Sequence, residues 1–285
     1  MLISPEELQL SLAEPALRLF DTTVHMRPGP AGYEITSGRD SWQQSHIPGA
    51  SFMDLLGDLS DQSHRLRFMM PPEEQIVRVL SALGIDRSSR VVLYNAGPTW
   101  WATRAFFMLR AVGFDRVQVL DGGLDRWRLE QRPLESGARS YAPSRFTVGE
   151  RRPVFVDKAV VLAAMQTRDR HLMHALSPAV FSGEVVSYGR PGHIPGSVNL
   201  PATGLLDTAT QTFLPRDELR KRMAAVGVLD EKPTITYCGG GISATTNAFA
   251  LYLLGREDVQ IYDASMTEWG PDPTLPMETG PANVQ

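Results

Sequence analysis

The sequence predicts an α/β protein of two tandem domains, each with a mostly parallel sheet covered by helices on both faces. Short apolar strands alternate with helical stretches along the chain, and this alternation is typical of parallel sheets flanked by helices. Three sequence blocks of the first half also return, in the same order, in the second half. A length of 285 residues suits two domains of this kind.

The elements follow from the spacing of apolar residues. Strands are expected where short apolar runs occur, and helices where apolar residues recur every three or four positions. The expected strands of the first half are 17–21, 50–54, 90–95 and 117–121, and its expected helices are 72–84 and 101–113. In the second half, a β-branched run at 233–237 predicts a strand, and residues 242–255 predict a helix.

The repeated blocks predict a duplicated domain. His46 recurs as His193, Asn95 lies opposite Cys238, and Trp127 lies opposite Trp269, at spacings of 147, 143 and 142 residues. These spacings are too long for a solenoid repeat. Residues 130–153 are rich in Pro, Gly, Ser and Arg and lack periodic apolar residues, which is typical of a linker. We therefore expect domains at 1–140 and 150–285.

Composition excludes several classes of function. The net charge of −4 gives no basic surface for nucleic acid or an anionic membrane. No apolar run is long enough to span a membrane, and the first ten residues lack the basic start of a signal peptide. A single cysteine excludes an internal disulfide, a CxxC redox pair and a thiolate zinc site. We expect a cytoplasmic protein without metal or cofactor.

The one cysteine, Cys238, begins a loop between a predicted strand and a predicted helix. Three glycines follow it (Gly239, Gly240 and Gly241), and then come Ile242 and Ser243, of which Ser243 is expected to cap the helix. Glycines allow successive backbone N–H groups to point at one anion, and a helix N-terminus favours negative charge. Proteins with parallel sheets also bind their ligands at the carboxyl ends of the strands. The loop therefore indicates a nucleophilic thiol; the alternative is a lone cysteine that packs as a small apolar residue.

On these features the chain resembles the tandem-domain rhodanese-like sulfurtransferases, which use thiosulfate or 3-mercaptopyruvate. The resemblance rests on the two similar halves, on the HIPG motifs at 46–49 and 193–196, and on a cysteine loop in the second half alone. It implies that Cys238 takes a sulfane sulfur from a small donor, holds it as a persulfide, and passes it to an acceptor such as cyanide or a thiol. Asn95 at the cysteine position implies a non-catalytic first domain. A protein acceptor is left open.

The chain departs from the family pattern at two positions. The loop resembles that of mercaptopyruvate-preferring members, but Gly240 stands where they carry a hydroxyl residue. The resemblance implies a proton relay from that hydroxyl to His46 and Asp40. Leu176 stands where the family carries a donor-binding arginine, and Arg190 is the nearest basic residue that could replace it. We therefore expect weak donor binding.

Two other functions fit parts of the sequence. A cysteine phosphatase needs an arginine at the end of its loop to hold phosphate, and no arginine follows Cys238 before Arg256; the sequence disfavours this function. A catalytically weak or silent rhodanese module with a binding or regulatory role stays open as the alternative.

Overall fold

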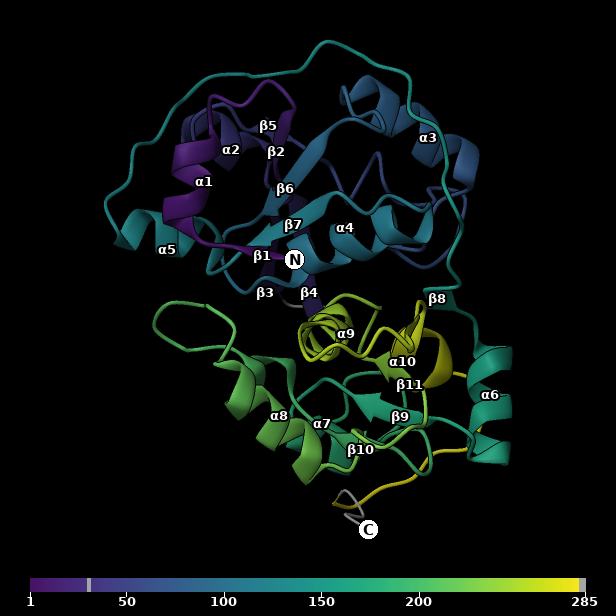
Figure 1. Cartoon of the computed structure of the whole chain (residues 1–285). Helices are drawn as coiled ribbons and strands as arrows, with labels where there is room; N and C mark the ends of the chain where they lie inside the picture. The colour runs from purple at the N-terminus through teal and green to yellow at the C-terminus, as the bar shows by residue number, and fades with distance from the viewer. Residues whose placement is uncertain (30–31, 282–285) are drawn as a thin grey trace. The chain divides into compact units, whose positions relative to one another are not determined.

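The computed structural model describes residues 1–29 and 32–281 and divides the chain into two compact units. The first unit comprises Met1–Arg152 together with Thr208–Thr212, and the second comprises Pro153–Asp207 together with Phe213–Gln285. Each unit contains one five-stranded parallel sheet with flanking helices (Figure 1). The predicted fold class is confirmed.

The first unit is built on a sheet with the strand order β1-β7-β6-β2-β5. These strands are β1 (Leu2–Ile3), β7 (Val117–Leu120), β6 (Arg90–Tyr94), β2 (Leu17–Asp21) and β5 (Ser51–Phe52). Its helices are α1 (Pro5–Ser11), α2 (Arg39–Gln44), α3 (Glu73–Ala82), α4 (Trp100–Ala111) and α5 (Gly123–Leu129). The central strand β6 is buried from Val91 to Tyr94, as expected of a parallel strand covered on both faces.

The second unit repeats this order as β8-β12-β11-β9-β10. The strands are β8 (Phe155–Val156), β12 (Val259–Tyr262), β11 (Thr234–Tyr237), β9 (His171–His174) and β10 (Val198–Asn199). The helices are α6 (Lys158–Thr167), α7 (Pro178–Ser182), α8 (Arg216–Ala225), α9 (Ala244–Leu253) and α10 (Ser265–Trp269), with a 3-10 helix at Ala202–Leu205. Helix α9 packs on β11 and β12 and is buried over nearly its whole length, so it gives the preceding loop a rigid base.

The sequence did not predict an antiparallel hairpin in the first unit, β3 (Val24–Gly29) paired with β4 (Gly32–Ser37). Its charged, proline and glycine residues are interspersed with apolar ones. Neither the two-residue apolar period of a strand nor the 3.6-residue period of a helix stands out there. The residues that join the two strands, 30–31, lie outside the described part of the chain.

The segment predicted as a linker between the domains packs on the first unit through Arg152. The Tyr141 hydroxyl accepts a hydrogen bond from the Leu19 amide at 2.9 Å and donates one to the Gly49 carbonyl at 2.9 Å. Phe146 is buried, with its ring 6.0 Å from that of Phe114. Two aromatic anchors thus hold a stretch whose composition is typical of a loop.

Candidate active site

Cys238 lies at the carboxyl end of β11, a central strand of the second sheet, and begins the loop to α9. The position predicted from the sequence, at a strand-to-helix junction, is confirmed. The thiol is not disulfide-bonded, and the residue is only 2% exposed. Burial alone would fit a structural cysteine, so the surroundings of the loop decide what the thiol can do.

Ser265 fixes the shape of the loop from the start of α10. Its Oγ accepts hydrogen bonds from the amides of Cys238 at 3.1 Å and Gly241 at 3.2 Å, and donates one to the Tyr262 carbonyl at 2.7 Å. Ser265 has a φ of +50°, and its counterpart in the repeat, Gly123, has a φ of +55°. A serine in this left-handed region is strained, and the three hydrogen bonds offset the strain.

The next two residues of α10 hold the loop carbonyls. The amide of Met266 donates to the Cys238 carbonyl at 3.0 Å, and the amide of Thr267 donates to the Gly239 carbonyl at 2.8 Å. The Thr267 hydroxyl donates to the same carbonyl at 2.6 Å. The sequence analysis missed Ser265 and Thr267, although the repeat carries a signal: the block around Trp127 has a glycine where its partner has Ser265.

Four amides of the loop remain available to a ligand. In the described part of the chain, the N–H groups of Gly239, Gly240, Ile242 and Ser243 have no hydrogen-bond acceptor. They precede α9, whose N-terminal end carries partial positive charge. Ser243 occupies the N-cap position without a side-chain capping bond, so the expectation of a serine cap was wrong, and its amide stays open. The arrangement can bind a small anion.

The corresponding loop of the first unit is filled by its own side chains. The Asn95 side chain donates to the carbonyls of Ala96 at 2.7 Å and Pro98 at 2.8 Å. The amide of Ala96 donates to Thr23 Oγ1, and the amide of Gly97 donates to Asp125 Oδ2, both at 2.9 Å. Asn95 thus stands at the position of Cys238, and side-chain oxygens accept hydrogen bonds from the amides that follow it.

Strand register and repeat spacing identify the counterparts of these side chains in the second unit. Asp21 pairs with Tyr94 and His174 pairs with Tyr237, so Thr23 corresponds to Leu176. The spacing of 142 residues makes Asp125 the counterpart of Thr267. Neither accepts a bond from the Gly239 or Gly240 amide. The backbones also differ, since the left-handed loop glycine is Gly97 in one unit and Gly241 in the other.

The three loop glycines have different reasons to be glycine. A Cβ on Gly239 would lie 2.1 Å from the Tyr188 hydroxyl oxygen, and Gly241 has a φ of +71°. A Cβ on Gly240 would meet only Thr267 Oγ1, at 3.8 Å, and its φ is not in the left-handed region. The need for an open φ value therefore lies at Gly241, and the need for a close approach lies at Gly239.

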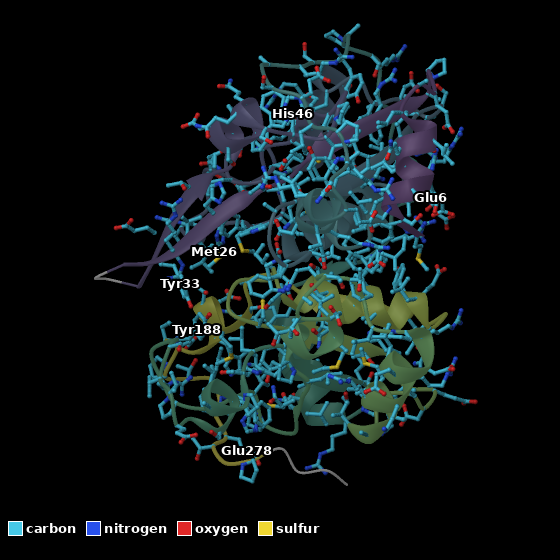
Figure 2. The ribbon with its side chains drawn as sticks, turned by 90° about the vertical axis from the view of Figure 1, so that its left-hand side faces the viewer. Glu6, Met26, Tyr33, His46, Tyr188 and Glu278 are labelled. Atoms are coloured by element: carbon cyan, nitrogen blue, oxygen red, sulfur yellow. The ribbon has the colours of Figure 1, made fainter. Side chains whose placement is uncertain are left out.

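The two proposed relay residues belong to the first unit, where they do not form a pair. The His46 ring is fully buried (Figure 2), stacks on Trp42, and has its Nδ1 2.7 Å from the Trp42 carbonyl oxygen. Its backbone pairs with Glu135. Asp40 is exposed at the start of α2 and is not among the hydrogen-bond partners of His46 in the described residues. These contacts support a turn-fixing role for His46.

His193 repeats this arrangement in the second unit. Its Nδ1 lies 2.7 Å from the Phe181 carbonyl oxygen, its ring stacks on Phe181 with centroids 3.5 Å apart, and its backbone pairs with Glu278. These contacts tie the turn that contains His193. The equivalent bonds in both units show that the HIPG motif is a structural feature of the fold.

Arg190 does not have the freedom expected of an anion ligand. Its guanidinium donates to the carbonyls of Trp269, Gly270, Asp272 and Leu275 at 2.5 to 3.2 Å. Four of its five N–H groups are thereby used. Arg190 anchors the segment after α10, and the expectation that it replaces the family arginine at the donor site was wrong for this reason.

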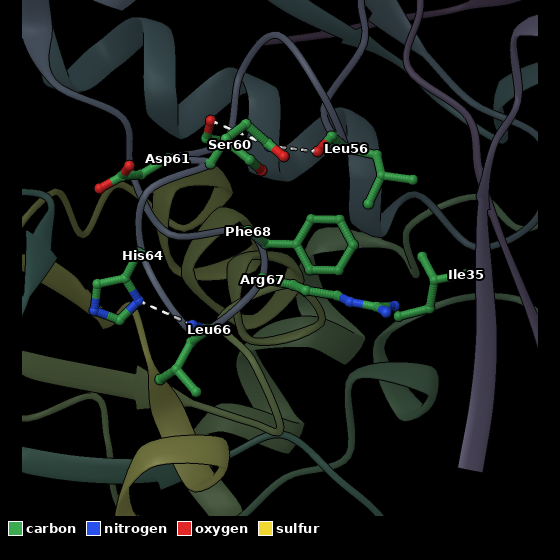
Figure 3. A pocket seen from close by; sticks show the side chains of 9 residues that line it. Ile35, Leu56, Ser60, Asp61, His64, Leu66, Arg67 and Phe68 are labelled. Carbon is green, nitrogen blue, oxygen red and sulfur yellow. Dashed lines mark hydrogen bonds between the residues drawn. The ribbon is translucent and has the colours of Figure 1, made fainter. Parts of the chain in front are cut away.

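A separate cavity of about 290 Å³ lies in the first unit, between the β4 side chain Ile35 and residues 56–68. Figure 3 shows the Arg67 side chain extending beside Phe68 toward Ile35. Its lining residues are Ile35, Leu56, Ser60, Asp61, Gln62, His64, Leu66, Arg67 and Phe68. None of these residues carries a thiol.

Among residues 1–29 and 32–281, no group of three or more His, Cys, Asp or Glu side chains is placed to hold a metal ion. Over the same residues, no helix has the length and apolar character needed to cross a membrane.

The two similar parallel sheets, with a cysteine loop in the second unit, define a class of two-domain thiol proteins. Comparison with known proteins identifies the family. The rhodanese-like domain family matches residues 4–130 and 164–272. A mitochondrial thiosulfate/3-mercaptopyruvate sulfurtransferase of Arabidopsis thaliana is 33% identical over 97% of this chain and 78% of its own length. The 3-mercaptopyruvate sulfurtransferase of Escherichia coli is 32% identical over 93% of either chain.

A solved structure agrees with these matches. The crystal structure of SseA from Escherichia coli, a 3-mercaptopyruvate sulfotransferase, aligns with a TM-score of 0.83 at 29% identity and covers 93% of this chain and 98% of that one. This chain belongs to the rhodanese-like family.

Proposed function

We propose that this chain is a sulfurtransferase that moves a sulfane sulfur from a small anionic donor to a thiophilic acceptor through a persulfide on Cys238. Thiosulfate and 3-mercaptopyruvate are the donors named for its relatives, and cyanide or a thiol serves as acceptor. The proposal requires no metal and no cofactor, because the thiol itself carries the transferred atom.

The observation that carries the proposal is the state of the loop amides in the two units. In the second unit, a cysteine is followed by amides that lack acceptors in the described residues. In the first unit, the cysteine is replaced by Asn95, and the amides of Ala96 and Gly97 are satisfied by side chains. An anion site is thus kept open only where a nucleophile is present.

The reaction divides into two displacements at sulfur. The Cys238 thiolate attacks the sulfane sulfur of thiosulfate; a new S–S bond forms, the donor S–S bond breaks, and sulfite leaves with the bond's electron pair. The acceptor, for example cyanide, then attacks the outer sulfur of the persulfide, leaves as thiocyanate and regenerates the thiolate. The loop amides stabilise the negative charge on the sulfur in both steps.

The loop favours 3-mercaptopyruvate over thiosulfate as the natural donor. It offers amides and a helix terminus to an anion but places no basic side chain directly after Cys238. The two negative charges of thiosulfate are therefore compensated less completely there than the single carboxylate of 3-mercaptopyruvate. Leu176 adds no charge, and the Arg190 N–H groups that donate to carbonyls are not available to the donor. We further assign the chain to the cytoplasm, because a protein with a single reactive thiol suits a reducing compartment.

One observation favours a second candidate, a rhodanese module that binds anions without turnover. The family arginine is replaced by Leu176, and Arg190 is bound to four carbonyls. Such a module would bind thiosulfate at the loop amides but would leave Cys238 without added sulfur.

A donor panel tests the proposed function. Thiosulfate and 3-mercaptopyruvate are each supplied with cyanide or a thiol, and turnover is measured for the parent chain and for Cys238→Ser. We expect turnover in the parent, lost in Cys238→Ser with an unchanged melting temperature, because an alcohol stores no persulfide. Equal turnover in both proteins would remove Cys238 from the mechanism, and donor binding without turnover in the parent would support the second candidate.

A further inference from the structure

Residues 61–69 form a closed surface loop in the first unit and supply most of the lining of its cavity of about 290 Å³. The Asp61 amide donates to the Met69 carbonyl at 3.0 Å, and this bond joins the two ends of the loop. Compact surface loops of about 6–16 residues with joined ends frequently carry a function. We call this segment the 61–69 loop.

Buried side chains hold the 61–69 loop in a strained conformation. Phe68 has a φ of +64°, in the left-handed region that a bulky residue rarely adopts. Its carbonyl accepts a hydrogen bond from the Arg104 guanidinium at 2.5 Å. Its ring is only 7% exposed and packs on Trp101, with centroids 5.0 Å apart. Strain that is maintained by buried contacts is typical of ligand-binding segments, and these contacts fix the backbone from which Arg67 extends.

Arg67 brings an unpaired positive charge to the cavity. In the described part of the chain, its guanidinium has no hydrogen-bond or ion-pair partner. Figure 3 shows it extending beside Phe68 toward Ile35. In the same view the Asp61 carboxylate projects away from the guanidinium, and this carboxylate accepts hydrogen bonds from the Ser63 amide at 2.9 Å and hydroxyl at 2.6 Å. The cation is therefore available to a ligand.

The surroundings of this cation select an organic anion. The Ser60 hydroxyl and the Gln62 side chain donate to backbone carbonyls of residues 55–60, so they hold the chain rather than a ligand. A guanidinium binds a carboxylate through two parallel N–H groups, and apolar walls take a carbon chain. The volume lies near the lower end of the range of ligand sites, about 300–1,000 Å³. The apolar side chains near the guanidinium are Ile35, Leu56 and Phe68.

We propose that this cavity binds a small monocarboxylate with an apolar tail. The carboxylate pairs with Arg67, and the tail lies against the three apolar side chains. All the lining residues belong to the first unit, and binding there breaks no bond. The inference therefore goes beyond sulfur transfer and gives a ligand to the unit that carries Asn95 in place of the cysteine.

The test measures the affinity of the full chain for phenylacetate by calorimetry, with acetate and the uncharged phenylacetamide beside it. We expect phenylacetate to bind at least about tenfold more tightly than acetate, because its ring leaves water, and phenylacetamide to bind far more weakly. Arg67→Gln should weaken phenylacetate binding about fivefold or more, the effect of losing a partly exposed charge pair. Arg65→Gln removes an exposed charge of the same loop that does not line the cavity and should match the parent.

Two further measurements locate the ligand. Phenylacetate should slow hydrogen exchange in the 61–69 loop, and Ile35→Ala should weaken phenylacetate binding more than acetate binding. Slower exchange at the Cys238 loop alone, or equal affinities of the parent and Arg67→Gln, would overturn the inference. Inorganic phosphate that binds as tightly as phenylacetate would also contradict it, because phosphate has no apolar tail. None of these outcomes depends on sulfur loading of Cys238, so this inference and the proposed function fail separately.

Discussion

Gly239 and Gly240 are neighbours in the loop, yet only Gly239 is required to be glycine by its surroundings. The Tyr188 hydroxyl occupies the space of a Cβ at 239, whereas a Cβ at 240 has its nearest neighbour at 3.8 Å. A contact of 3.8 Å is ordinary packing, and one of 2.1 Å forces the loop or the tyrosine to move.

We predict that Gly239→Ala lowers sulfur transfer at least about tenfold, because the displaced loop no longer presents its amides to the donor. Gly240→Ala, the matched control, should keep most of the activity. Steady-state kinetics with one donor measures both. Parental activity in Gly239→Ala would show that Tyr188 does not constrain the loop.

Leu176 is the residue that we expect to weaken donor binding most, because it stands where the family carries a donor-binding arginine. A charge-assisted hydrogen bond from an arginine is worth about 1.5–3 kcal/mol, and Leu176 supplies none. We predict that Leu176→Arg lowers the KM for both donors by roughly tenfold or more, with a smaller change in kcat. Leu176→Met, similar in length but uncharged, is the control. An unchanged KM in Leu176→Arg would show that the pocket is not shaped as in the rest of the family.

Sequence reasoning located the nucleophile but not the residues that support it. Cys238 stood out because it is the single cysteine and precedes three glycines. Ser265, Thr267 and Tyr188 act on the loop from positions far along the chain, and no local pattern reports such contacts. Arg190 was misread for a related reason: sequence shows a positive charge, but not the carbonyls that already bind it.

At the scale of elements, the strand–loop–helix that carries Cys238 or Asn95 is supported in each unit by the next strand–loop–helix along the chain. In the second unit, the start of α10 holds the Cys238 loop through Ser265 and Thr267. In the first unit, Asp125 of α5 accepts from Gly97. The position of Asp125 and Thr267 is thus one of two at which the filled loop differs from the open one, the other being that of Thr23 and Leu176.

We predict that Thr267→Asp raises the donor KM by about tenfold, equivalent to about 1.4 kcal/mol. The new carboxylate would lie beside the Gly240 amide, as Asp125 does beside Gly97, and would compete with and repel an anionic donor. Thr267→Asn has a similar shape without the charge and should have a smaller effect. If both variants raise KM equally, the effect is steric and the charge argument fails.

The longer elements were predictable from the sequence, and the shortest were not. The expected strand at 90–95 and helix at 72–84 correspond to β6 and α3. Of the expected strand at 50–54, only Ser51–Phe52 is paired, because the strand lies at the edge of the sheet with one neighbour. β1 and β8 have two residues each, too few for any periodicity to appear.

At the scale of the whole molecule, the two units should respond differently to acid. Asp21 and His174 occupy equivalent positions at the ends of β2 and β9, and both are buried. Burial raises the pKa of Asp21 from 3.8 to about 6, against hydrogen bonds from Thr23 that lower it. Burial lowers the pKa of His174 from 6.5 to about 3, and the nearby His193, whose pKa burial also lowers, adds to this.

The signs of the two effects are opposite. The unfolded chain protonates His174 first, so the second unit loses stability as the pH falls from about 6.5 toward 3, by about 2 kcal/mol at pH 5. The folded chain protonates Asp21 first, so the first unit gains stability as the pH falls from about 6 toward 3.8, by about 1 kcal/mol between pH 7 and pH 5.

We predict that hydrogen exchange at pH 5, corrected for its intrinsic rate, shows lower protection in β9 and β11 than at pH 7, with no loss in β2 and β6. His174→Phe, which keeps an aromatic ring but cannot titrate, should reduce the loss in the second unit. Equal loss of protection in both units would contradict the assignment of these two groups.

The central claim is that Cys238 carries the transferred sulfur, and the mass of the loaded protein tests it most directly. The chain is incubated with 3-mercaptopyruvate or thiosulfate without an acceptor, and its intact mass and peptides are measured. Because the chain has one cysteine, we predict one added sulfur atom, on the peptide that contains Cys238, and its removal by cyanide. No added sulfur with either donor, or the same addition in Cys238→Ser, would contradict the account.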